Sequence, residues 1–223
     1  TYACLVTGLM LLAAPAGALI PDDITMNTST PWVTAGNGET ATVTVQVTNS
    51  STPADGVAID FAVNNSTYGS CLPARTIANN TGYATTVFTP GTASGYATIT
   101  ATVDGVKKSV VLYIDHAAPY RIANIWYKPE VTAGAESEIV VRVVDRHGNA
   151  VDNRNATETV SFMVGSPSGA AVFVGGTDEI TVPVDAAGNA TARLRVDTLV
   201  GEHLVVIQPP APVRGEYITI LGV

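Results

Sequence analysis

The side chains that most often perform catalysis or bind metals are few and scattered in this sequence. The three histidines occur singly, without the spacing of zinc ligands: His116, His147 and His203. Cys71 has no histidine near it in the sequence, so it is predicted to be a structural or weakly exposed thiol. Residues 165–169 (Gly-Ser-Pro-Ser-Gly) approach the nucleophile elbow of hydrolases, but Pro167 and the lack of a following helical pattern indicate a loop. We therefore predict no catalytic residue and no cofactor.

Acidic residues near several predicted turns raise the question of calcium. Calcium takes roughly six to eight oxygen ligands, and the acidic pairs Asp145 with Asp152 and Asp178 with Glu179 supply too few. Asp145 and Asp185 each precede a glycine by three residues. In such a turn the carboxylate accepts a backbone hydrogen bond and the glycine adopts a positive φ. The sequence therefore favours structural turns, and we predict no metal site.

Three aromatic residues are the best candidates for contact with a ligand. Trp32 follows Pro31 in the first half of the chain, and Trp126 with Tyr127 ends a predicted strand near the middle. An exposed indole can stack on a sugar or anchor a protein contact, because it combines a large apolar surface with a polar group. The alternative is that both tryptophans pack on the core or between the two halves of the chain.

Sequons for N-linked glycans recur along the chain, and many fall in predicted turns. Such glycans are carried by surface loops of exported proteins. The candidate modification sites are Asn27, Asn49, Asn64, Asn65, Asn79, Asn155 and Asn189.

The elements that position these side chains are predicted to be strands. The 223 residues are rich in Val and Thr, which pack well on pleated sheets, and include 20 Gly and 13 Pro, which favour turns. Charged residues make up only 13% of the chain, and the net charge of −8 argues against a nucleic-acid partner, which would require a basic surface. This composition disfavours helical bundles and doubly wound nucleotide-binding folds.

Strand patterns repeat twice after the first twenty residues. Residues 41–48 alternate Ala or Val with Thr or Gln, which is the period of a strand with one buried face, and residues 139–144 show a weaker version. Each half offers about seven short strands separated by turns rich in Gly, Asn and Asp. We predict an all-β fold of two tandem immunoglobulin-like antiparallel β-sandwiches, residues 19–115 and 116–223. A short linker containing Pro119 should hold them as an extended rod without a closed cleft.

Residues 1–18 are interpreted as a secretory signal peptide that lacks its start. The segment is uncharged, its apolar run ends at Pro15, and small residues follow where signal peptidase cleaves. The alternatives are a short transmembrane anchor and the hydrophobic helix of a pilin-like subunit. No later apolar run is long enough for a membrane, so the mature modules are not expected to insert into one.

Four segments of the second half form a characteristic series: residues 131–134 (Val-Thr-Ala-Gly), strand 139–144, turn 145–151 and the Asp-x-x-Gly-x-Ala segment 185–192. With these segments the second half resembles the group 1 bacterial Ig-like domain (Big-1), the repeated module of invasin and intimin. The first half is similar but degraded: residues 33–36 and 80–84 match, whereas a longer loop at 48–56 replaces the first Asp-x-x-Gly turn. The resemblance implies a tandem pair of Ig-like modules in a surface protein.

The function expected from these observations is non-catalytic. The chain would be an exported cell-surface stalk or adhesin-type segment that spaces or presents a binding region. Its partners would be other proteins or surface polysaccharide, contacted through regions outside this chain. Two alternatives stay open: an envelope lattice subunit, of S-layer or sheath type, and a carbohydrate-binding accessory module of an extracellular enzyme.

Overall fold

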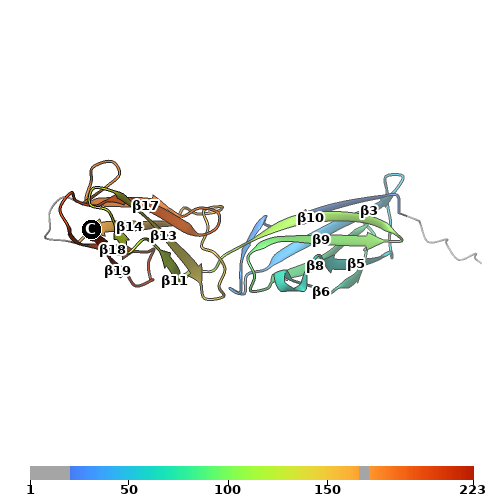
Figure 1. The fold of residues 1–223 in the computed structure, drawn as a ribbon. Coiled ribbons are helices and arrows are strands. Elements are labelled where there is room, and N and C mark those ends of the chain that lie inside the picture. The colour runs from blue at the N-terminus through green and yellow to red at the C-terminus, as the bar shows by residue number, and fades with distance from the viewer. Residues whose placement is uncertain (1–20, 166–170) are drawn as a thin grey trace, which may run out of the picture.

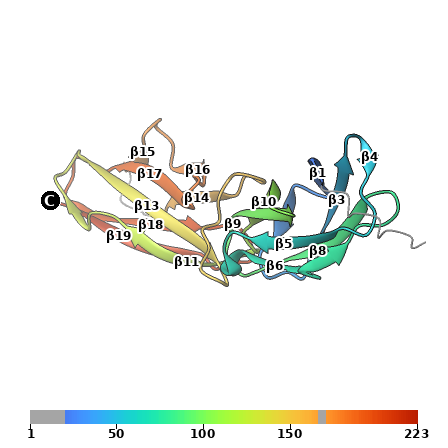
Figure 2. The ribbon, with the colours of Figure 1, turned by 90° about the vertical axis from the view of Figure 1, so that its right-hand side faces the viewer.

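The computed structural model describes residues 21–165 and 171–223. The predicted signal peptide and residues 166–169 of the serine-containing loop lie outside this part of the chain. The fold class predicted from the sequence is confirmed: two β-sandwiches lie end to end, joined by residues 116–118 (Figure 1). The view turned by 90° shows the same elongated arrangement (Figure 2).

The first sandwich consists of two five-stranded sheets. The order of one sheet is β1 (Asp23–Thr28), β3 (Ala41–Asn49), β8 (Tyr83–Pro90) and β6 (Gly69–Leu72), with β4 (Thr52–Pro53) paired to β3. The order of the other is β2 (Trp32–Thr34), β10 (Val106–Asp115), β9 (Gly95–Val103), β5 (Ala58–Val63) and β7 (Arg75–Ile77). A short 3-10 helix, η1 (Ser66–Tyr68), precedes β6.

The second sandwich pairs a four-stranded sheet with a five-stranded sheet. The order of the first is β11 (Pro119–Trp126), β13 (Glu136–Asp145), β17 (Asn189–Arg195) and β15 (Val172–Phe173). The order of the second is β12 (Glu130–Val131), β19 (Glu216–Gly222), β18 (Gly201–Gln208), β14 (Thr159–Val164) and β16 (Glu179–Pro183). In the described residues, no helix is long and apolar enough to cross a membrane.

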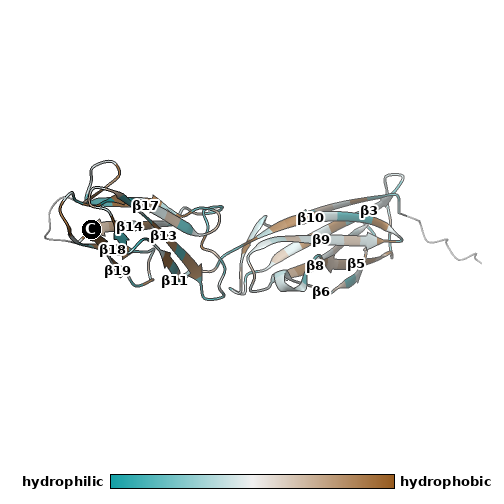
Figure 3. Ribbon diagram, viewed as in Figure 1, coloured by the Kyte–Doolittle hydropathy of each residue, from teal (hydrophilic) through white to brown (hydrophobic). Residues whose placement is uncertain are grey.

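Each sandwich has a hydrophobic core of its own, because the inward residues of its two sheets face each other. The alternation predicted for residues 41–48 is present in β3, where Ala41, Val43, Val45 and Val47 are fully buried and Thr42 is exposed. Hydrophobic residues, brown in Figure 3, lie along the strands of both sandwiches.

The repeated Thr-Ala-Gly motif has a structural counterpart in both sandwiches. In each one, a short strand before the motif pairs in parallel with the last strand, β2 with β10 and β12 with β19. The alanine of the motif then donates its N–H to the end of that last strand, Ala35 to Asp115 O and Ala133 to Val223 O. The motif therefore closes the same end of both sandwiches, and in the first sandwich this is the end that receives the second.

Candidate functional site

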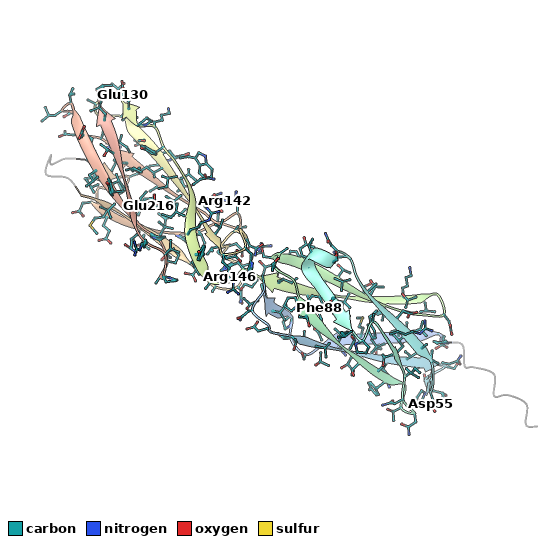
Figure 4. The ribbon with its side chains drawn as sticks, turned by 90° about the horizontal axis from the view of Figure 1, so that it is seen from below. Asp55, Phe88, Glu130, Arg142, Arg146 and Glu216 are labelled. Atoms are coloured by element: carbon teal, nitrogen blue, oxygen red, sulfur yellow. The ribbon has the colours of Figure 1, made fainter. Side chains whose placement is uncertain are left out.

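Side-chain hydrogen bonds are numerous at the junction between the two sandwiches. It joins the end of β10 and two loops of the first sandwich to the turn after β13 and the loop that follows it. Arg146, in that turn, lies between the two sandwiches in Figure 4, whereas Asp55 and Glu130 lie at opposite ends of the molecule.

At the centre of the junction, a tyrosine of the first sandwich contacts a carboxylate of the second. Tyr113, on β10, donates its hydroxyl to Asp152 Oδ2 at 3.0 Å, and both residues are buried. Arg154 binds the same carboxylate through its side chain and its backbone N–H. Its guanidinium carbon also lies 4.7 Å from the centre of the Tyr113 ring, within cation–π range. One carboxylate therefore gathers donors from both sandwiches.

This arrangement shifts the acid–base properties of its members. Burial acts to raise the pKa of Asp152, but the hydrogen bonds from Arg154 and Tyr113 outweigh it and hold that pKa below its usual value. Burial, followed by the charge of Asp152, raises the pKa of Tyr113 above its usual value. The hydrogen bond to Asp152 raises the pKa of Arg154. At neutral pH the cluster therefore consists of a carboxylate, a neutral phenol and a guanidinium.

The connector is fixed by side chains on both sides of it. Asp145 Oδ2 accepts the N–H of Ala117 at 2.9 Å, and Asn155 Nδ2 donates to Asp115 Oδ2 at 2.8 Å. His116 places one ring nitrogen 2.7 Å from Ala117 O and the other 3.3 Å from Asp152 O. The three residues between the sandwiches are therefore not a free hinge.

The turn after β13 also contacts the end of the first sandwich. Asn149 Oδ1 accepts a hydrogen bond from the N–H of Ser94 at 3.0 Å, and Asn149 Nδ2 donates one to Thr92 O at 2.8 Å. Arg146 donates to Gly36 O at 2.9 Å. A Cβ placed on Gly36 would lie 2.5 Å from His147 Nε2, so the glycine of the Thr-Ala-Gly motif permits this close approach.

The two Asp-x-x-Gly turns have the structure expected from the sequence. Asp145 Oδ1 accepts the N–H groups of residues 147 and 149, and Asp185 Oδ1 accepts those of residues 187 and 189. Gly148 and Gly188 have φ of 88° and 76°. The two turns differ in what their Oδ2 atom binds. Asp145 Oδ2 accepts the N–H of Ala117 in the connector, whereas Asp185 makes no bond to the connector in the described residues.

One group of residues at the junction has donor atoms close enough for a metal ion. The donor atoms of Asp115, His116 and Asp152 lie within 4.8 Å of one another, a set that sequence spacing alone did not bring together. In this geometry the carboxylate oxygens accept hydrogen bonds from the protein's own groups, including Asn155 and Arg154. The hydrogen bonds account for the cluster without a metal, and we assign none.

The aromatic candidates lie in different surroundings. Trp32 is half-buried, and its ring centre lies 4.1 Å from that of Tyr113, beside the junction. Trp126, on β11, is 48% exposed, which contradicts the alternative that both indoles are packed away. With Tyr127 it lines a surface groove of about 500 Å³ on the second sandwich.

The sequons differ in how available their side chains are. Asn27, Asn64, Asn65 and Asn79 are exposed, Asn49 is half-buried, and Asn189 is half-buried at the start of β17. Asn155 is exposed as a residue, but its amide nitrogen, the atom that a glycan would need, donates to Asp115. A glycan there would compete with the junction, so we regard Asn155 as the least suitable of these sites.

Two further candidates from the sequence are buried in the cores. Cys71 lies in the first core, and burial raises its pKa to about 11, so it is a poor nucleophile at neutral pH. His203, on β18, is 1% exposed, and neither of its ring nitrogens has a hydrogen-bond partner in the described residues.

The junction residues that matter most were not identified from the sequence. Asp152 had been weighed only as a calcium ligand and Asn155 only as a glycosylation site, and Tyr113 and Arg154 had not been singled out. A signal existed in the density of Asp, Asn and Arg in residues 152–155, which is unusual in a chain with so few charges.

The comparisons with known proteins agree with this architecture. No protein-family model matches the chain, and no curated protein matches its sequence. The structure of FdeC, an Escherichia coli adhesin, matches with a TM-score of 0.66 and 17% identity, over 95% of this chain and 66% of that one. InvD of Yersinia pseudotuberculosis matches with a TM-score of 0.64 and 21% identity, over 88% of this chain and 57% of that one. This chain thus spans less than two thirds of either structure.

At these identities the likeness establishes the fold. The chain is a tandem pair of Ig-like β-sandwiches, as the sequence predicted, and it shares this fold with FdeC and InvD.

Proposed function

We propose that this chain is a non-catalytic stalk segment of a cell-surface, adhesin-type protein. Its work is to hold its two ends apart at a fixed relative orientation. The observation that carries the proposal is the hydrogen-bonded junction, in which Asp152, Asp145 and Asn149 of the second sandwich bind groups of the first sandwich or of the connector. Its likeness in fold to FdeC, an adhesin by name, supports the surface role.

A stalk needs resistance to bending, and the junction supplies it through directional contacts. Net hydrogen-bond free energies are about 0.5–1.5 kcal/mol each, and bonds to charged groups are stronger. Five or more such bonds, acting together on a three-residue connector, disfavour any change in the angle between the modules. The fold-level comparisons and the low charge of the surface are compatible with this role.

The test compares two aspartates that occupy equivalent turns. Asp145→Ala removes the turn bonds and the bond to the connector N–H, whereas Asp185→Ala removes only turn bonds of the same kind. Residual dipolar couplings should give one alignment tensor for both modules in the unmodified chain and in Asp185→Ala. Asp145→Ala should give two tensors, because the modules then reorient independently.

Solution scattering provides the second measurement. The ten-residue strands β10 and β13 each span roughly 33 Å, so modules placed end to end require a maximum dimension above about 65 Å. Two tensors in the unmodified chain, or a folded-back particle, would contradict the stalk. Concentration-dependent growth into ordered arrays would instead favour the envelope-lattice alternative.

A further inference from the structure

A groove on the outer face of the second sandwich combines aromatic and charged side chains. It lies over the sheet of β11, β13 and β17 and is lined by Trp126, Tyr127, Lys128, Glu136, Glu138, Val140 and Arg193. The pairing register explains the layout. Trp126 lies opposite Val140, and Glu138 lies opposite Arg193.

The apolar part of the groove is an exposed aromatic surface. β13 alternates inward Ile139 and Val141 with outward Glu138 and Val140, so that Val140 forms a hydrophobic floor beside the indole. Trp126, one of two tryptophans in the chain, is 48% exposed. Its indole offers both an apolar face and an N–H donor to a molecule in the groove.

The polar part consists of ion pairs that can be exchanged at little cost. Arg193 lies 3.4 Å from Glu138, and Arg195 lies 3.3 Å from Glu136, with side chains 40–61% exposed. Exposed pairs of this kind contribute little to stability, because water screens their attraction. Their carboxylates and guanidinium groups can therefore turn toward a ligand with both donors and acceptors.

The positive and negative charges that line the groove cancel, which favours an uncharged ligand. Lys128 and Arg193 balance Glu136 and Glu138, so the groove has no net charge. One row further along the same face, Asn124 and Asn189 flank Arg142. The surface thus presents amides, carboxylates and guanidinium groups around an indole.

We propose that this groove binds a neutral oligosaccharide, with a sugar ring stacked on Trp126 and its hydroxyls hydrogen-bonded to Glu138 and Arg193. A pyranose has the complementary chemistry: an uncharged ring with polarised C–H groups on its faces and hydroxyls, which both donate and accept, around its edge. The groove volume of about 500 Å³ is typical of small-ligand sites. This site would give the stalk a binding activity of its own.

The experiment uses tryptophan emission from the full chain. In a Trp32→Phe background the signal comes from Trp126 alone, because the chain has two tryptophans. The neutral probes are hexasaccharides of cellulose, xylan, mannan and chitin, and the charged probes are a heparin hexasaccharide and hexagalacturonate. We expect at least one neutral probe to shift and quench the emission at millimolar concentration, with little dependence on salt.

Variants then assign the site by calorimetry with the neutral probe. Trp126→Ala should weaken binding at least about tenfold, which corresponds to about 1.4 kcal/mol. Glu138→Gln should weaken it several-fold. The matched control is Tyr217→Ala, which removes an aromatic side chain that is 74% exposed on the other sheet, and it should bind as well as the unmodified chain.

Three outcomes would overturn the proposal. The first is that no neutral probe changes the emission of Trp126. The second is that only the charged probes bind, with affinity that falls as salt rises. The third is that Trp126→Ala and Tyr217→Ala lose binding equally, which would place the sugar elsewhere. None of these outcomes bears on the tensor measurement, so the stalk proposal stands or falls separately.

Discussion

Tyr113 of the first sandwich donates its hydroxyl to the carboxylate of Asp152 in the second at 3.0 Å, and both residues are buried. The two residues are distant in sequence, and their contact is one of several hydrogen bonds that join the sandwiches. Arg154 completes the group by neutralising the carboxylate. This buried hydrogen bond favours the arrangement of the modules in which it forms, because any other arrangement would remove the Tyr113 donor and leave Asp152 only its contacts with Arg154.

Removal of the Tyr113 hydroxyl should loosen the junction without disturbing either core. We expect Tyr113→Phe to lower the stability of the paired modules by about 1.5–3 kcal/mol, the usual contribution of a hydrogen bond to a charged group. Urea unfolding measures the loss. Tyr217→Phe, at an exposed position, is the control and should be neutral. Equal effects of the two substitutions would argue against a special role for the hydroxyl.

The Asp152 carboxylate should make the junction sensitive to acid. Its folded pKa lies below the unfolded value of about 3.9, so its contribution is fully present above that value and is lost as pH falls through the folded pKa. The stability difference between the unmodified chain and Asp152→Asn should be constant from about pH 5 to 8 and should shrink below about pH 4. Urea titrations at each pH measure it, and a difference independent of pH down to the acid limit would contradict the assignment.

The longer strands could be predicted from the sequence because their side chains obey a period of two. The segments 41–48 and 139–144 both lie within observed strands, β3 and β13. Shorter strands were missed, among them β2 and β12, which pair for only two or three residues. Such strands carry too few residues to display a period, and their pairing with a strand distant in sequence supplies most of their stability.

The site was harder to predict than the fold, for a physical reason. Turn chemistry is local, so the roles of Asp145 and Gly148 could be derived from neighbouring residues. The contact of Tyr113 with Asp152 depends on how two separately folded sandwiches dock, and no local pattern encodes it. The exposure of Trp126 likewise follows from its position on the outward face of an edge strand, which requires the sheet order to be known.

Cys71 should resist chemical modification until the first sandwich unfolds. Burial raises its pKa to about 11, so at pH 8 it is neither accessible nor ionised. Peptide-resolved alkylation with iodoacetamide should leave Cys71 unlabelled in the native chain and labelled in urea. Ser70→Cys places an exposed thiol next to it and should be labelled at once. Rapid native labelling of Cys71 would show that β6 opens readily.

The paired turns allow the cost of a positive φ to be separated from that of a steric clash. A Cβ on Gly148 would meet nothing within 4 Å, whereas one on Gly188 would lie 2.9 Å from Val143 O. Gly148→Ala should therefore cost about 1–2 kcal/mol for its φ alone. Gly188→Ala should cost a further 1–3 kcal/mol or so, because backbone atoms must shift. Urea unfolding of both variants measures this difference, and equal losses would show that the clash relaxes freely.

His203 offers a substitution that should stabilise the chain. Its imidazole is buried against the second core without a hydrogen-bond partner in the described residues, and its cross-strand neighbour is Ile220. The corresponding pair in the first sandwich is apolar, Ala97 with Leu112. Because an unsatisfied buried polar group costs about 1–3 kcal/mol, His203→Leu should raise the free energy of unfolding at pH 7 by an amount in that range.

Thermal and urea unfolding would measure this gain, with His147→Leu as the matched control. His147 is exposed and accepts a hydrogen bond from Arg146, so its replacement should bring no gain in stability. A loss of stability in His203→Leu would contradict this prediction, and it is the result expected if bound water satisfies the ring nitrogens.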